Sequence, residues 1–251
     1  MREREDQSDV LENIDPNYLT RRPDFIRYIT DLASDIIKDR VWLDPDFACD
    51  ILTDKVAFAK VTLIDKATLL LDKIYQTSPY VSRACCYANA VACFSLAHKL
   101  AYPVYVERLF RNRMEDINWT YRTKFNIGRQ EAVAMELLGW NTSVTPTSDF
   151  LALYFAKGVA FEDDSCRCGE RMDQHTFELF QSYTEAYSTL ANEAFEFQKY
   201  RPSILAAAIL YATRKVFGMD IIWRDELIEL TGYKEFELDH VFDHFWNHLR
   251  K

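Results

Sequence analysis

One cluster of residues near the middle of the chain has the types and spacing that could bind a metal ion. Cys166 and Cys168 are separated by a single residue, and His175 follows them. Thiolate and imidazole groups are the ligands that zinc prefers, but a closed zinc site needs a fourth ligand that this segment does not supply. The alternative is a solvent-exposed loop, and we expect that alternative.

A second candidate cluster lies near the end of the sequence, where His240, His244 and His248 recur every four residues. This spacing places the three imidazoles along one stripe of a helix, where they could chelate a divalent ion. The alternative is a helix face that is partly surface and partly core, together with the neighbouring Phe242 and Phe245. We expect no metal at either cluster.

The sequence has no recognisable catalytic motif. No two glycines are close enough to form a phosphate-binding loop, and no serine or cysteine lies in a nucleophile elbow. The acidic run Glu162-Asp163-Asp164 is expected to be a solvated turn. We therefore predict a protein that is not an enzyme and that uses no cofactor.

Composition indicates a helical, globular protein. Of 251 residues, 49% are hydrophobic and 14% are aromatic, whereas there are only six glycines and seven prolines. Such content disfavours disorder and turn-rich β-structures, and it favours long helices joined by short turns. The net charge of −9 disfavours nucleic acid as a partner, because phosphate binding depends on Lys and Arg.

Other sequence features bear on where the protein is found. The N-terminal segment is charged and has no apolar core, so no secretory signal is expected. The longest nearly apolar run, 204–212, is too short to span a membrane. Three of the six cysteines lie in one apolar stretch, which favours reduced thiols. We expect a nuclear or cytoplasmic protein with no membrane partner.

The stretch 83–100, RACCYANAVACFSLAHKL, is the segment around which we expect the fold to be organised. It is rich in Ala and Cys and contains neither Gly nor Pro, so it favours a helix. A helix that is small and apolar on nearly every face must be buried on nearly every face. It should therefore be the hub of a helical bundle.

The hydrophobic pattern predicts the same arrangement twice. In each half we expect five helices, of which the third is apolar throughout, and we interpret this as an internal repeat. We expect an N-terminal segment at 1–20 with a short helix interrupted at Pro16, a first domain at 21–143 and a second at 144–251. A connection at 41–59 has no clear period. The expected helices span 23–40, 61–75, 83–100, 104–110 and 125–138 in the first domain, and 145–155, 177–197, 204–218, 223–230 and 236–249 in the second.

The first half resembles a cyclin box and the second half resembles the C-terminal cyclin fold. The order and spacing of short motifs over about residues 20–249 carry this resemblance. It implies an all-α protein of two tandem five-helix cyclin folds, each built around a buried central third helix. The matching segments are Leu70–Lys73, Leu96–Lys99, Arg129–Glu131 through Gly139-Trp140, Pro146–Phe155, Tyr200–Ser203 and Leu230–Tyr233.

Cyclins activate cyclin-dependent Ser/Thr kinases, so the resemblance implies a regulatory subunit that controls cell-cycle progression. In the family, a lysine and a glutamate bind the backbone beside the mobile αC helix of the kinase, and Lys99 and Glu131 match them. Leu100, Met135 and Trp140 would supply apolar contact. The alternative is a lysine that only complements a helix dipole and an exposed first-turn acid.

The resemblance also implies a structural ion pair between Arg22 and Asp72, for which two solvated charges are the alternative. Phe25 and Tyr28 could line a groove for substrate or inhibitor peptides, although burial in the core is favoured. The chain departs from many cyclins where Leu100 and the residues after it replace glutamates. The connection at 41–59 is also longer than in common cell-cycle cyclins.

A second class of function remains open from the sequence. The core of general transcription factor IIB also pairs two cyclin-like folds, and it holds DNA through basic helices. The net charge of −9 disfavours such a transcription-associated scaffold. A mobility-shift assay at moderate salt would distinguish the two classes.

Overall fold

The computed structural model describes residues 14–37, 53–77, 83–101, 126–161, 164–165 and 171–250. Regular structure in these ranges is helical, and Ser165 and Arg171 form an isolated antiparallel bridge. The predicted all-α class is therefore confirmed. The chain divides into two compact units, with the boundary in sequence between Val144 and Thr145.

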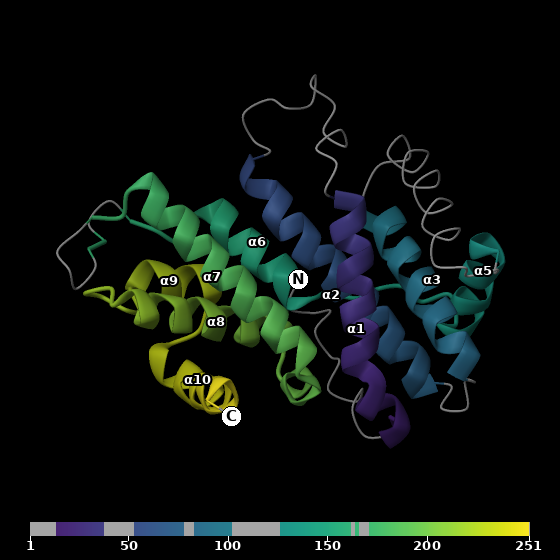
Figure 1. Ribbon diagram of the computed structural model, residues 1–251. Helices are drawn as coiled ribbons and strands as arrows, with labels where there is room; N and C mark the ends of the chain where they lie inside the picture. The colour runs from purple at the N-terminus through teal and green to yellow at the C-terminus, as the bar shows by residue number, and fades with distance from the viewer. Residues whose placement is uncertain are drawn as a thin grey trace. The chain divides into compact units, whose positions relative to one another are not determined.

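The N-terminal unit is built around its third helix. Side chains 88–95 of this helix, α3, are all buried, as predicted for the hub. Its small residues allow α1, α2 and α5 to pack against it from several directions (Figure 1). The described helices of this unit are α1 (Pro16–Ile37), α2 (Thr53–Thr77), α3 (Arg83–Ala101) and α5 (Ile127–Leu137).

Helix α1 begins earlier than the sequence predicted. It starts at Pro16 and continues through Pro23, which was expected to be its first residue. A proline inside a helix lacks an amide donor and destabilises the helix by about 3 kcal/mol. The neighbouring side chains of Tyr18 and Arg22 are both bound to Asp72 of α2, and these tertiary contacts stabilise the first turns.

Helix α2 also begins earlier than predicted, at Thr53 instead of Val61, so the end of the 41–59 connection is helical. The segment 53–59 contains no Gly or Pro and is too short to show a period by itself, and this explains the error. The helix ends at Thr77, before Pro79, as expected. The predicted helix at 104–110 lies outside the described residues.

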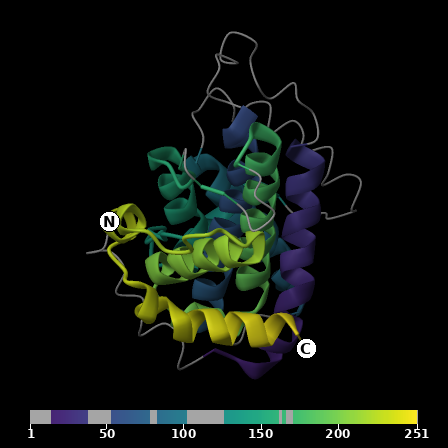
Figure 2. The same ribbon diagram turned by 90° about the vertical axis from the view of Figure 1, so that its left-hand side faces the viewer.

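The C-terminal unit repeats the arrangement around α8. Helices α6, α7, α9 and α10 all contact α8, and Figure 2 shows α10 lying alongside it. This unit contains α6 (Thr147–Lys157), α7 (Gln174–Glu193), the short 3-10 helix η4 (Phe195–Lys199), α8 (Pro202–Phe217), α9 (Asp225–Thr231) and α10 (Glu235–Leu249).

Local sequence explains both ends of α8. Pro202 occupies the first helical position, where its missing amide proton has no acceptor to lose. Gly218 closes the helix in the left-handed conformation, with φ of 63°. Arg214 and Lys215 lie in the last turn. Between these ends, the side chains from Leu205 to Arg214 are all buried.

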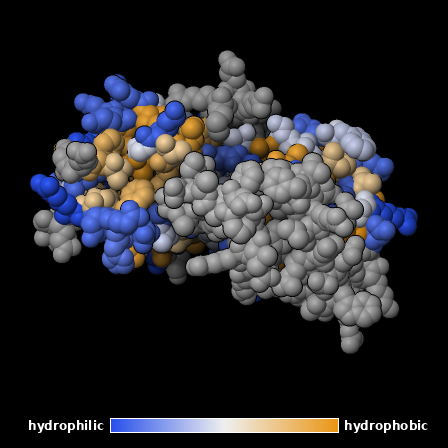
Figure 3. Space-filling model, turned by 90° about the horizontal axis from the view of Figure 1, so that it is seen from above, coloured by the Kyte–Doolittle hydropathy of each residue, from blue (hydrophilic) through white to orange (hydrophobic). Residues whose placement is uncertain are grey.

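The surface of the described residues is mixed. Hydrophilic and hydrophobic residues are interspersed on the face drawn in Figure 3. Within the described part of the chain, no helix combines the length and the apolar character that crossing a membrane requires.

Candidate functional site

Lys99 and Glu131 meet at one edge of the N-terminal unit. Lys99 lies in the last turn of α3, and its Nζ is 2.7 Å from Glu131 Oε2 on α5. The Lys99 side chain is 35% exposed and that of Glu131 is 13% exposed. Two residues that are 32 positions apart in the sequence therefore form one partly accessible charged pair.

Packing of α5 against α3 fixes Glu131 in place. Asn126 caps α5 by accepting a hydrogen bond from the Arg129 amide at 3.0 Å. One turn into the helix, Gln130 Nε2 donates to Asn89 Oδ1 of α3 at 2.7 Å. The cap fixes the start of α5, and the bond between Gln130 and Asn89 joins α5 to α3. Together they hold the Glu131 carboxylate beside the C-terminal end of α3.

The two groups of the charged pair have the chemistry to bind backbone groups of a partner. A lysine ammonium has three donors and a carboxylate accepts about four hydrogen bonds, so each can make more bonds than the one between them. Lys99 can donate to backbone carbonyls and Glu131 can accept from backbone amides. Such charge-assisted hydrogen bonds are about twice as strong as neutral ones.

Exposed apolar side chains lie close to the pair in the sequence. Leu100, which follows Lys99, is 53% exposed, and Trp140 is 70% exposed. Met135, one turn after Glu131, is half-buried. Val133, also exposed on α5, was not singled out from the sequence. Aromatic groups that become buried on binding are typical of the centre of a protein interface.

Trp140 has an unusual backbone. Its φ is +60°, and the preceding Gly139 is also left-handed with φ of +57°. The Trp140 amide donates to Met135 O at 2.8 Å, which ties this turn to the end of α5. A positive φ is strained for a bulky residue, so the turn holds an exposed indole in a conformation that glycine or asparagine would adopt more easily.

Arg22 and Asp72 form a buried pair inside the same unit. Arg22 Nε and Nη2 donate to the two oxygens of Asp72, each at 2.8 Å, and Tyr18 donates to Oδ1 at 2.6 Å. Burial lowers the pKa of Arg22, but attraction and hydrogen bonds to Asp72, together with Tyr18, raise it above its usual value. Burial raises the pKa of Tyr18 well above its usual value, and Asp72 raises it further.

Phe25 does not line an open groove. Its ring is 1% exposed and packs edge-on against Tyr87, at a centroid distance of 5.4 Å. Tyr28 is half-buried and contacts the same Tyr87 ring. Phe25 therefore belongs to the core, the interpretation that the sequence analysis favoured over a groove, because the inward face of α1 carries it toward α3.

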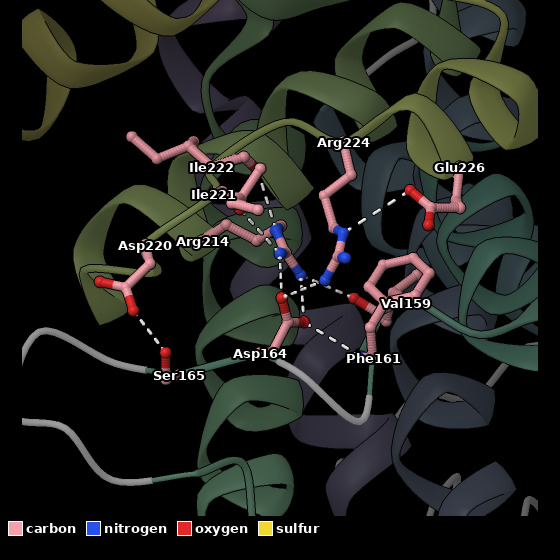
Figure 4. Close-up of polar contacts among 10 residues, drawn as sticks. All are labelled: Val159, Phe161, Asp164, Ser165, Arg214, Asp220, Ile221, Ile222, Arg224 and Glu226. Atoms are coloured by element: carbon pink, nitrogen blue, oxygen red, sulfur yellow. Dashed lines mark hydrogen bonds and ion pairs between the residues drawn. The ribbon is translucent and has the colours of Figure 1, made fainter.

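The prediction of a solvated turn at Glu162-Asp163-Asp164 was wrong for its last residue. Asp164 is 3% exposed, and its Oδ1 accepts hydrogen bonds from two arginines (Figure 4). Arg214 Nη2 donates at 2.7 Å and Arg224 Nη1 donates at 3.2 Å. The Phe161 amide donates to Asp164 Oδ2 at 3.0 Å. A buried carboxylate is stable only when it is paired in this way.

Arg214 is the centre of this cluster. Its guanidinium also donates to the backbone carbonyls of Val159, Ile221 and Ile222, each at 2.9 Å (Figure 4). Together with its two bonds to Asp164, all five N–H groups have acceptors. Arg214 thus joins the segment before α7 to the segment before α9. It does much more than complement the dipole of α8.

The histidine stripe of α10 contacts η4 and the residue after it. Glu196 accepts from His248 Nδ1 at 2.5 Å and lies 3.3 Å from His244 Nε2. Tyr200 Oη lies 3.0 Å from His244 Nδ1 and 3.4 Å from His240 Nε2. Among the described residues, no group of His, Cys, Asp and Glu side chains is arranged to hold a metal ion. Cys166 and Cys168 lie outside those residues.

Two comparisons with known proteins agree with this architecture. Residues 149–251 match the sequence model of the cyclin C-terminal domain. Over 185 residues the chain is 24% identical to the Cyclin-J-like protein of mouse, an alignment that covers 70% of this chain and 46% of the mouse protein. The chain thus spans about half the length of that relative. These findings show that the C-terminal unit is similar to the cyclin C-terminal domain, and they support the resemblance of the chain to cyclins.

Proposed function

We propose that this chain binds and activates a cyclin-dependent Ser/Thr kinase, in the nucleus or cytoplasm, and thereby regulates cell-cycle progression. The N-terminal unit would serve as the cyclin box, and the chain itself would catalyse no reaction. The observation that carries the proposal is the meeting of Lys99 and Glu131 at 2.7 Å on an accessible edge. Exposed Leu100 and Trp140 supply the apolar contact that a charged pair alone lacks.

The mechanism would be a shift of the kinase between two conformations. When its αC helix is displaced, the catalytic Lys–Glu pair of a kinase cannot form. A rigid surface that binds only the inward position of that helix stabilises the active state by its differential affinity. Lys99 and Glu131 would bind backbone groups beside the helix, and Trp140 would contact it by its apolar ring.

The proposal is tested with a panel of purified cyclin-dependent kinases and a histone substrate. The wild-type chain is expected to bind at least one kinase and raise its phosphorylation rate. Lys99→Glu and Glu131→Lys are each expected to weaken binding by about thirtyfold or more, because each leaves partner groups facing a like charge or an unfilled contact. Full activation by both variants would reject the assignment of the site.

Two controls separate binding from folding. Arg27→Glu makes the same charge change at a side chain of α1 that is 75% exposed, and it should leave activation unchanged. The double variant Lys99→Glu with Glu131→Lys restores a pair of opposite charges within the chain. Its free energy of unfolding should therefore be close to that of wild type. It should still fail to activate the kinase, since the partner meets the wrong charge at each position.

A further inference from the structure

Ser95 holds the second oxygen of the Glu131 carboxylate. It lies on α3, one turn before Lys99, and is 2% exposed. Its hydroxyl donates to Glu131 Oε1 at 2.5 Å, while Lys99 Nζ lies 2.7 Å from Oε2. Residues four apart share one helix face, so a single face of α3 binds both oxygens of one carboxylate.

The two bonds differ in how firmly they hold Glu131. The Lys99 side chain is long and 35% exposed, so water and salt compete for its ammonium group. Ser95 has a short side chain in the buried part of the hub, where solvent does not compete. The serine bond therefore defines the direction of the carboxylate whether or not Lys99 leaves to bind a partner.

We propose that Ser95 is a positioning residue for partner binding at this surface. It would keep Glu131 in one orientation before the partner arrives, so that less rotamer freedom is lost on binding. Being buried, Ser95 would not touch the partner itself. This inference rests on the proposed function, because it assigns to Ser95 an effect on the affinity for a kinase.

The decisive experiment is a double-mutant cycle with Ser95→Ala and Glu131→Ala. The probe is whichever kinase of the purified panel the wild-type chain binds most tightly, and the dissociation constant is measured for all four proteins. Ser95→Ala should weaken binding about tenfold when Glu131 is present, as expected for loss of a hydrogen bond to a charged group. In the Glu131→Ala background the same change should have an effect of about twofold or less, because no carboxylate remains to be positioned.

A matched control and an unfolding measurement distinguish positioning from general destabilisation. Ser34→Ala removes a serine hydroxyl from α1 that donates to Thr30 O at 2.7 Å, and it should leave kinase affinity unchanged. Alanine is a strong helix former, so Ser95→Ala should remain folded. Urea unfolding of each protein verifies this.

The possible results distinguish failure of the role of Ser95 from failure of the proposed function. Equal loss of affinity with and without Glu131, or no loss at all, would overturn the role of Ser95 and leave the proposed function standing. If the wild-type chain binds no kinase of the panel, the proposed function fails and the role of Ser95 in kinase binding fails with it. A loss that depends on Glu131 supports both.

Discussion

Arg22 and Asp72 are 50 residues apart in the sequence, and two hydrogen bonds of 2.8 Å join them where neither side chain exceeds 4% exposure. The C-terminal unit also has a buried pair, Arg214 with Asp164, again separated by 50 residues. The pairs do not occupy equivalent places. The first joins α1 to α2, whereas the second joins α8 to the segment before α7. The two units thus share the order of their helices around a buried third helix, but not the polar contacts that fix it.

Replacement of Asp164 by Asn should strongly destabilise the C-terminal unit. The change leaves the Arg214 guanidinium buried without its counter-charge, and breaking a buried pair from one side costs about 3–5 kcal/mol. Urea unfolding followed by circular dichroism measures the loss. Glu226→Gln is the control, since the Glu226 side chain pairs with Arg224 but is 56% exposed. It should lower the free energy of unfolding by about 0.5 kcal/mol or less. Equal effects of the two variants would contradict the importance of the cluster.

The Asp164 cluster also marks the limit of what the sequence could predict. Ala-rich helices without interior Gly or Pro, such as α3 and α8, were predicted almost to their ends, because helix propensity is a local property. The burial of Asp164 depends on Arg214, which lies far along the chain, and no local pattern contains that information. The sequence did contain one indication of this cluster. Arg214 lies in the Ala-rich segment that forms α8, and an arginine buried there needs an acidic partner.

The same distinction holds for the candidate site. Lys99 and Glu131 were singled out by family spacing, and the structure brings them together. Nothing in the local sequence singles out Ser95. Its bond to Glu131 crosses 36 residues, so it could be found only once α5 was placed against α3. Trp140 was noted for its ring, but its positive φ follows from the turn after α5 and is invisible in the sequence.

Ionisation of Tyr18 should make the N-terminal unit sensitive to alkaline pH. Burial raises the pKa of its phenol well above the usual value, and Asp72 adds to this rise. Above about pH 10 the unfolded chain loses the phenolic proton while the native chain retains it, so stability falls as pH rises from there toward the native pKa. Below about pH 10 this contribution is fully present.

The variant Tyr18→Phe tests this dependence. It should be less stable than wild type by about 1.5–3 kcal/mol at pH 8, because a hydrogen bond to a charged group is lost. Between pH 10 and 11 its stability should fall less steeply than that of wild type, by up to about 1.4 kcal/mol per pH unit for one group. Urea unfolding from pH 8 to 11 gives both quantities. Tyr183→Phe, at a residue that is 45% exposed, is the control and should keep the wild-type slope.

Cys93 should be protected from alkylation in the native protein. Its side chain is 0% exposed in the hub, and burial raises the pKa of the thiol above its ordinary value. Because the thiolate is the reactive form, labelling requires opening of the fold. Iodoacetamide labelling at pH 8, read by peptide mass spectrometry, should be at least about a thousandfold slower than in urea. Rapid labelling without urea would mean that α3 opens locally.

Replacement of Trp140 by Asn should separate stability from binding. The left-handed conformation costs a residue with a bulky side chain about 1–2 kcal/mol, and asparagine tolerates it better. The indole is 70% exposed, so little packing is lost with it. Trp140→Asn should therefore unfold at the same urea concentration as wild type or at a higher one, with a gain of up to about 1 kcal/mol.

Kinase affinity should change in the opposite direction. Exposed tryptophans that become buried in an interface contribute about 2 kcal/mol or more, so Trp140→Asn should weaken binding by about thirtyfold. Phe236→Asn removes a ring of α10 that is 71% exposed, and it controls for the loss of an exposed aromatic group elsewhere. A stable Trp140→Asn protein with full affinity would place the indole outside the interface. A gain in stability together with a loss of binding would indicate that the strained turn is retained for the partner it contacts.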